Sequence, residues 1–412
     1  MAVALTVARS HVMAKLLINV VRLTLPALIL VVLVLELFFR LVIPASDQPM
    51  GWFDESQRIY RFDTRRPTGV VTIGRFAQQR GRWHINNAGW NSPVDYVRSK
   101  TKPRIAIIGD SYIEAWHVDS NESYPSKLRV LLGDAFDVYS FGVSGAPLSQ
   151  YLHMARYAVE QYDPDLLIFT IIHNDFDESL RRINTGSRHF MLLDIQDGRV
   201  SETTPEPDPS FVQYNRTKRL LRRSALVRYL TFNLQISGVL DRLRQRRVEY
   251  VANIDPAAIA RDQDDVRRAM HYVGERMATE FKDRRIVFVM DGPRSAIYAN
   301  TFDTLNESVQ FLHTLTAEVC AENGISLLDL SVPMRKAYAE NGRHFESEWD
   351  FHWNEYGHEY VARAVADLLE EILPTTRATY EGKLTFKSAS LRPGTTTTHS
   401  PRPADIAAMR RD

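Results

Sequence analysis

The feature that most constrains the fold is a short apolar run, Arg104 to Ile108, that ends abruptly at Gly109-Asp110-Ser111. An isoleucine-rich run bounded by small and polar residues is typical of a buried β-strand followed by a turn. In open α/β folds, parallel strands deliver the residues that follow them to the carboxyl edge of the sheet, where ligands bind. Ser111 is therefore a candidate nucleophile, although Gly, Asp and Ser are also ordinary turn residues.

From residue 104 onward, strand-like and helix-like patterns alternate along the chain. The strand-like runs lack a polar face, which indicates a parallel sheet buried on both sides by helices. The predicted strands are 104–108, 136–140, 166–172, 285–290 and 325–330. The predicted helices lie near 123–132, 149–161, 304–322 and 356–372. This order predicts the α/β class.

Three further groups of polar residues follow predicted strands or precede a predicted helix. Gly145 follows the strand at 136–140, Asn174 follows the strand at 166–172, and Asp350-Phe-His352-Trp-Asn precedes the last helix. A turn glycine, a strand-capping asparagine and a solvated histidine would explain each group alone. Their common position at strand ends favours a shared site instead.

Together the four groups resemble the SGNH (GDSL-like) hydrolase superfamily, whose signature blocks supply Ser, Gly, Asn and His in this chain order. The resemblance covers residues 104–372 in scattered blocks. It implies a flavodoxin-like three-layer sandwich around a parallel sheet. The last block, Asp-x-His-Trp, departs from the commoner Asp-x-x-His and is similar to that of the membrane-anchored alginate O-acetylation proteins.

The resemblance also assigns catalytic roles. A serine hydroxyl needs a base that removes its proton during attack, and an acid that orients that base. Ser111 would be the nucleophile, His352 the base and Asp350 the orienting acid. Because the spacing of the last block differs from the commoner pattern, Glu346 and Glu348 remain alternatives for the acid.

Attack on an ester develops negative charge on the carbonyl oxygen, which aimed hydrogen-bond donors stabilise. The resemblance implies that the donors are the backbone N–H of Ser111, the backbone N–H of Gly145 and the side-chain amide of Asn174. Glycine permits close backbone approach, and an asparagine amide donates without titrating.

No cofactor is expected. His117 and His173 lack partners at metal-ligand spacing, and Gly142 and Gly145 do not form a dinucleotide fingerprint. The formal net charge of +1 gives no overall field that would favour nucleic acid. The single cysteine, Cys320, lies in an apolar helical pattern and is expected to be a buried hydrophobic residue.

Residues 17–44 are expected to form a transmembrane anchor. The stretch from Leu23 to Phe39 is almost wholly apolar and ~17 residues long, the lower limit for crossing a bilayer. A cleaved signal peptide is the rival, but no small-x-small cleavage pattern follows. Basic residues precede the span and no acid lies among residues 1–22, so the positive-inside rule places the rest of the chain outside the cytoplasm.

The domain organisation follows from these patterns and from composition. Residues 176–262 interrupt the α/β alternation, contain Pro205, Pro207 and Pro209 and a basic stretch, and are expected to form a mostly helical insertion that acts as a lid. The predicted parts are a cytoplasmic N-terminus (1–16), the anchor (17–44), a lead-in segment (45–100), the hydrolase-like domain with its insertion (101–374) and a disordered tail (375–412).

Three functions stay open at this point. The first is a membrane-tethered serine esterase that removes acyl groups, chiefly acetyl, from an extracytoplasmic glycan or glycolipid. The second is a polysaccharide O-acetyltransferase, in which a sugar hydroxyl replaces water at the same site. The third is a glycan-binding or assembly protein without catalysis, which would not need a nucleophile and a base.

Overall fold

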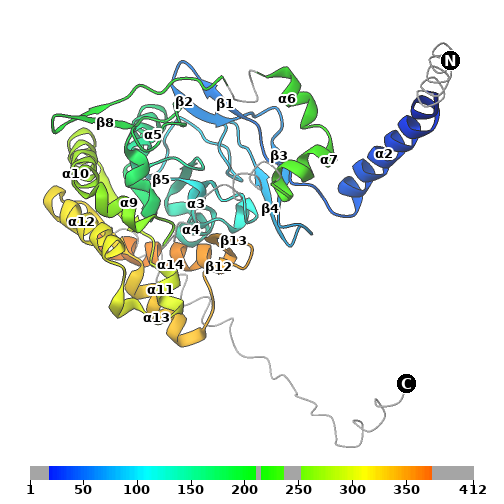
Figure 1. The fold of residues 1–412 in the computed structure, drawn as a ribbon. Helices are drawn as coiled ribbons and strands as arrows, with labels where there is room; N and C mark the ends of the chain where they lie inside the picture. The colour runs from blue at the N-terminus through cyan, green and yellow to red at the C-terminus, as the bar shows by residue number, and fades with distance from the viewer. Residues whose placement is uncertain (1–17, 210–214, 236–251, 374–412) are drawn as a thin grey trace, which may run out of the picture. The chain divides into compact units, whose positions relative to one another are not determined.

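The computed structural model describes residues 18–209, 215–235 and 252–373 (Figure 1). The expected cytoplasmic N-terminus at 1–16 and the expected disordered tail at 375–412 lie outside the described residues.

The fold is built on a parallel sheet of five strands in the order β11-β10-β7-β5-β6. All of its strand pairs are parallel. The strands are β5 (Arg104–Gly109), β6 (Asp137–Gly142), β7 (Leu166–Ile171), β10 (Arg285–Met290) and β11 (Ser326–Asp329). Every residue of β5 and β7 is buried, as expected of central strands covered on both faces. The predicted α/β class and its five strands are confirmed.

Helices cover both faces of the sheet. The element bounds are α4 (Tyr124–Leu132), α5 (Leu148–Tyr162), α10 (Gln263–Glu280), α12 (Glu307–Asn323), α13 (Ser331–Asn341) and α14 (Glu355–Ile372). Phe169 of β7 belongs to the apolar core formed with α5, α10 and α12. The hydroxyl of the next residue, Thr170, faces that of Tyr124 of α4. Because neighbouring strand residues point to opposite faces, these contacts place the two helical layers on opposite sides of the sheet.

The segment at 45–100 forms two β-hairpins that pack on the sheet. Strand β1 (Gly51–Asp54) pairs with β2 (Ile59–Phe62), and β3 (Thr68–Ile73) pairs with β4 (Gln79–His84). Beyond the hairpins, Asn91 donates a 2.7 Å hydrogen bond to the carbonyl of Glu114. Tyr96 donates one of 2.8 Å to the carbonyl of Ser140. This segment therefore supports the residues that follow β5 and the end of β6.

The apolar N-terminal span is helical. A π-helical turn, η1 (Val20–Thr24), continues into α2 (Leu25–Leu41). The combined 22-residue helix has a mean hydropathy of 2.4, and none of its most apolar window is buried. Its length and composition suit a membrane span, and a signal sequence would share both properties.

The insertion contains one hairpin and several short helices. Strands β8 (Leu193–Gln196) and β9 (Arg199–Glu202) pair across a turn at Asp197-Gly198, where both residues have positive φ. The expectation of a mostly helical insertion did not include this hairpin, although an Asp-Gly pair is a strong hairpin signal. The helices are α6 (Arg216–Leu221), α7 (Ala225–Arg228), the π-helical η7 (Tyr229–Asn233) and α9 (Pro256–Arg261).

Candidate active site

Ser111 is the first residue of a single helical turn, α3 (Ser111–Glu114), directly after β5. The side chain of Asp110 caps this turn by accepting a 2.9 Å hydrogen bond from the backbone N–H of Tyr112. Burial raises the pKa of Asp110 to about 6. The strand, turn and helix therefore present the half-buried Ser111 hydroxyl at the carboxyl edge of the sheet.

His352 reaches Ser111 from a separate hairpin, formed by β12 (Glu346–Ser347) and β13 (Asp350–Trp353). The distance from His352 Nε2 to Ser111 Oγ is 2.7 Å, and that from His352 Nδ1 to Asp350 Oδ1 is 2.6 Å. Burial opposes ionisation of Asp350, but the hydrogen bonds from His352 outweigh it and lower the pKa of this carboxyl. His352 Nδ1–H thus donates to Asp350, and Nε2 is left to accept from the serine.

The two alternative acids lie elsewhere. Glu346 accepts hydrogen bonds from Arg294 Nη1 at 3.0 Å and from the hydroxyl of Tyr298 at 2.6 Å. Glu348 is exposed. Asp350 is therefore the carboxylate that contacts the imidazole, despite the unusual spacing.

Arg294 ties the two catalytic segments together. It is the first residue of α11 (Arg294–Tyr298), and its Nη1 donates a 2.8 Å hydrogen bond to the carbonyl of Phe351. Its Nη2 donates to the hydroxyl of Tyr112, which donates in turn to the same carbonyl at 3.0 Å. Because Tyr112 and Phe351 are the neighbours of Ser111 and His352, this network holds these two side chains at contact distance.

Gly145 lies in the turn that follows β6. Its φ is +74°, which glycine adopts without strain, and a Cβ at this position would meet nothing within 4 Å. The requirement for glycine is therefore conformational. In the described part of the chain, the backbone N–H groups of Gly145 and Ser111 donate to no other group. Both donors are free to bind an oxyanion.

Glu114 fastens this turn to α3. Its carboxyl accepts hydrogen bonds from the hydroxyl and the backbone N–H of Ser144. Burial raises the pKa of Glu114 to about 8. The close approach also requires Gly142, where a Cβ would lie 2.2 Å from the backbone nitrogen of Glu114.

Asn174 lies in a single 3₁₀ turn, η4 (His173–Asp175), directly after β7. Its Oδ1 accepts a 2.8 Å hydrogen bond from the side chain of Asn253, and its amide donates to Glu178. An amide nitrogen carries two protons, so one remains for a substrate. Since β6, β5 and β7 are adjacent and parallel, the segments with Gly145, Ser111 and Asn174 share one edge of the sheet.

Two histidines that sequence reasoning did not assign to the site lie beside it. His117 stacks on His352 with ring centroids 4.6 Å apart, and its Nε2 lies 3.0 Å from Nε2 of His358. Burial and the two neighbouring histidines hold the pKa of His117 well below its usual value. A neutral ring over His352 would not oppose a positive charge on this imidazole. No sequence signal pointed to His117, because its contacts arise from distant segments.

One ligand atom each of His117, Asp350 and His352 lies within 4.8 Å of the others, a spacing that could hold a metal ion. Both nitrogens of each ring already have protein partners. Those of His352 face Ser111 and Asp350, and those of His117 face His358 and the carbonyl of Trp353. The donor set thus fits a hydrogen-bonded catalytic group better than a metal centre.

A cavity of about 270 Å³ lies next to the candidate catalytic residues. Its wall includes Tyr112, His173 and Phe351, which are the neighbours of Ser111, Asn174 and His352. The insertion contributes Ala252 and Asn253 to the same wall. This part of the insertion therefore reaches the candidate site.

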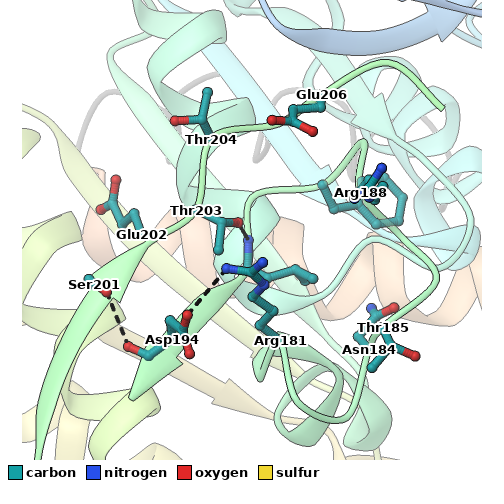
Figure 2. Close-up of a pocket in the computed structure, with 12 residues that line it drawn as sticks. Arg181, Asn184, Thr185, Arg188, Asp194, Ser201, Glu202, Thr203, Thr204 and Glu206 are labelled. Carbon is teal, nitrogen blue, oxygen red and sulfur yellow. Dashed lines mark hydrogen bonds and ion pairs between the residues drawn. The ribbon is translucent and has the colours of Figure 1, made fainter. Parts of the chain in front are cut away.

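A second cavity, of about 650 Å³, lies at the β8–β9 hairpin and contains none of the candidate catalytic residues (Figure 2). Arg181 and Asp194 face each other there in an ion pair of 3.3 Å. We assign no chemistry to it.

Comparison with known proteins supports the sequence resemblance. Residues 107–360, more than half of the chain, match the GDSL-like lipase/acylhydrolase family. No curated protein matches the sequence.

Solved structures with similar folds are remote in sequence. Est24, a carbohydrate acetylesterase from Sinorhizobium meliloti, is 12% identical, with a TM-score of 0.32, and the match covers 66% of this chain and 100% of Est24. An aryl esterase from M. smegmatis is 11% identical, with a TM-score of 0.33, over 66% of this chain and 100% of its own. TesA is 11% identical, with a TM-score of 0.36, over 66% of this chain and 99% of its own.

Proposed function

Because this chain belongs to the GDSL-like lipase/acylhydrolase family, we propose that it is a serine esterase, tethered to a membrane by α2, that hydrolyses acyl esters on an extracytoplasmic glycan or glycolipid. Acetyl is the preferred acyl group in this proposal. The observation that carries it is the continuous hydrogen-bonded chain from Asp350 through His352 to Ser111. Family membership supports carboxylic ester hydrolysis as the general reaction.

In the proposed mechanism, Ser111 Oγ attacks the ester carbonyl while His352 Nε2 accepts the hydroxyl proton. Asp350 stabilises the imidazolium that forms. The carbonyl oxygen becomes an oxyanion, which the N–H groups of Ser111 and Gly145 and the amide of Asn174 stabilise. The alcohol leaves with the proton from His352, and water then hydrolyses the acyl-serine by the same steps.

The surroundings of the site support a carbohydrate substrate. Trp349 precedes Asp350, Phe351 lies between Asp350 and His352, and their side chains are 51% and 82% exposed. Exposed aromatic rings beside a reaction centre can pack against the C–H face of a sugar. The adjoining cavity has hydroxyl and carboxyl groups from Tyr298 and Glu346 in its wall, which suit a hydroxyl-rich ligand.

Contacts of α2 with the folded domain support the tether. Glu36 accepts hydrogen bonds of 2.9 Å from the backbone N–H groups of Ala225 and Leu226, and Phe39 stacks on Tyr229. Cleavage of a leader after residue 44 would remove both partners from the domain. A permanent anchor keeps them, and the basic residues before the span support an extracytoplasmic domain.

The proposal is tested by incubating the full chain in detergent with aryl acetates and with acetylated oligosaccharides, with and without free sugar acceptors. Released acetate supports the esterase, whereas acetylated acceptor would support the O-acetyltransferase. Absence of both products, in a protein that still binds glycans, would favour the non-catalytic alternative. The matched control is Ser331→Ala, which removes a different buried serine.

A further inference from the structure

The C-terminal end of α2 is fastened to the insertion. The carboxylate of Glu36 caps the start of α7, because it accepts hydrogen bonds from the hydroxyl of Ser224 and from the backbone N–H groups of Ala225 and Leu226. The rings of Phe39 and Tyr229 stack with centroids 3.8 Å apart. These contacts hold α7 beside the last two turns of the apolar helix.

The length of the apolar helix sets the level of α7 relative to a bilayer. A helix of 22 residues is ~33 Å long, close to the thickness of the hydrocarbon core. Glu36 lies five residues before Leu41, which is about 8 Å of helix rise. If α2 spans a membrane, as the proposed function holds, α7 begins within about 8 Å of the level where the hydrocarbon meets the lipid headgroups.

The chain around α7 is strongly basic. Residues 216–235 contain six arginine and lysine residues and no acidic residue. Among them, Arg216, Arg219 and Arg223 have exposed side chains, and none of the three forms an ion pair with any residue that the structure describes. Such a concentration of uncompensated positive charge favours an anionic partner.

Exposed apolar side chains accompany the basic ones. Leu220, on α6, is 64% exposed, and Phe76, at the tip of the β3–β4 hairpin, is 68% exposed. The carbonyl of Arg75 accepts a 2.8 Å hydrogen bond from the hydroxyl of Tyr229, so this tip lies against the insertion. Basic residues mixed with exposed leucine and phenylalanine are typical of segments that lie in a membrane interface.

We propose that residues 216–234, together with Arg75 and Phe76, form an interfacial patch that docks on anionic lipid headgroups. The patch fixes the orientation of the hydrolase domain above the bilayer and is distinct from a lid over Ser111. Its apolar residues Leu226 and Leu234 pack with Phe39 and Tyr229 at the end of α2. The inference rests on the proposed tether, since it is the membrane helix that brings the patch to the headgroups.

A lipid-proximity experiment tests the patch. The full chain carrying Leu220→Cys, labelled with an environment-sensitive fluorophore, is reconstituted in phosphatidylcholine vesicles with and without phosphatidylglycerol. The native Cys320 is buried, and burial raises the pKa of its thiol to about 12, so it should remain unlabelled. Val332→Cys on α13 is the matched control, because Val332 is 68% exposed and is not part of the patch.

We expect quenching by headgroup-proximal spin-labelled lipid at position 220 and not at position 332. Anionic lipid should strengthen this quenching and high salt should weaken it, because a cation near an anionic surface shifts the docked equilibrium about fivefold. Arg216→Glu, Arg219→Glu and Arg223→Glu, combined, should abolish the dependence on phosphatidylglycerol and leave aryl acetate turnover unchanged.

Three further results would overturn the inference in different ways. Equal quenching at both positions in a chain that floats with the vesicles contradicts the patch alone. A chain that does not float with the vesicles contradicts the tether and the patch with it, while aryl acetate turnover still reports on the esterase. Capture of the patch by a soluble polyanion, with no response to phosphatidylglycerol, would replace lipid by an anionic glycan.

Discussion

Among the residues that the structure describes, two chains of hydrogen bonds begin with an Asp-His pair, and one of these two leads from the far imidazole nitrogen to a serine. In the first, Asp350 contacts His352 at 2.6 Å, and His352 contacts Ser111 at 2.7 Å. In the second, Asp329 contacts His313 at 2.7 Å, and Nε2 of His313 lies 2.9 Å from Nε2 of His173. The acid and the base are arranged almost identically.

The difference lies in the group at the far end and in its access. His173 is buried, and burial together with the neighbouring His313 and Arg294 holds its pKa well below the usual value. Ser331 is near His313 but faces Nδ1, the nitrogen already bound to Asp329, at 3.5 Å. An Asp-His pair is therefore no indication of catalysis by itself. A nucleophile on the free imidazole nitrogen, with oxyanion donors nearby, makes the difference.

The largest expected effect comes from removing the nucleophile of the first chain. Ser111→Ala should lower kcat/KM for aryl acetates by at least about 10⁴-fold, because nucleophile and base act as a unit. His352→Ala should have a loss of the same order. The matched change in the second chain, Ser331→Ala, should keep turnover within about threefold. Equal losses of kcat/KM in Ser111→Ala and Ser331→Ala would contradict a special role for Ser111.

The next comparison replaces the aspartate of each chain of hydrogen bonds by asparagine. Asp350→Asn should lower kcat by roughly 10³-fold to 10⁴-fold with little change in KM, because an amide favours the wrong tautomer of His352. Glu346 is held by Arg294 and Tyr298, so it should not rescue the variant. Steady-state kinetics measure kcat and KM of the variant, and circular dichroism is the control for folding. Near-normal turnover in Asp350→Asn would assign the orienting role to another acid.

Asp329→Asn should act on stability instead. Burial opposes ionisation of Asp329, but hydrogen bonds from His313 and Ser331 prevail and lower its pKa below 3.8. A lowered carboxyl pKa stabilises the fold above the unfolded-state pKa, and this stabilisation is lost as pH falls through the folded-state pKa. We expect the variant to lose about 1 kcal/mol of unfolding free energy at neutral pH.

Denaturant titrations of wild type and Asp329→Asn at several pH values measure this loss. The difference between the two proteins should shrink as pH falls below about 4. A difference that grows on acidification, or a loss of kcat as large as that of Asp350→Asn, would contradict a structural role for the second chain.

The smallest expected effect concerns substrate binding beside Ser111. Of the two histidines that contact an aspartate in these chains of hydrogen bonds, His352 has exposed aromatic residues next to it and His313 does not. Trp349→Ala should raise KM for an acetylated oligosaccharide about tenfold, by loss of ring packing, and leave kcat/KM for aryl acetates unchanged. The control substitution is Phe76→Ala, which removes another exposed aromatic side chain, in the β3–β4 hairpin. Equal KM changes for the large and small substrates would argue against a sugar platform.

Local sequence patterns were enough to predict the parallel sheet and the placement of the candidate residues at its edge. Ser111 and Asn174 each follow an apolar run, and Gly145 follows the strand-like run at 136–140. Adjacent parallel strands bring such residues to one edge. The structure also brings Asp350 and His352 to Ser111. The catalytic roles of these residues remain predictions until the variants are measured.

What was missed depends on contacts between distant segments. Asn253 reaches Asn174 across 79 positions, and Arg294 reaches Tyr112 across 182, so no local pattern encodes either contact. The helix α10 was not predicted, because its buried residues Val266, Met270 and Val273 are interspersed with many charges. Its helical spacing is visible only when those three are compared with their neighbours.

The most direct test of the central claim is to identify the residue that reacts with a fluorophosphonate. The full chain is labelled in detergent, digested, and mapped by mass spectrometry, with Asp350→Asn and Asp329→Asn treated in parallel. We predict a single adduct on Ser111, formed at the wild-type rate in Asp329→Asn and far more slowly in Asp350→Asn. An adduct on Ser331, or equal rates of Ser111 labelling in the two variants, would contradict the account.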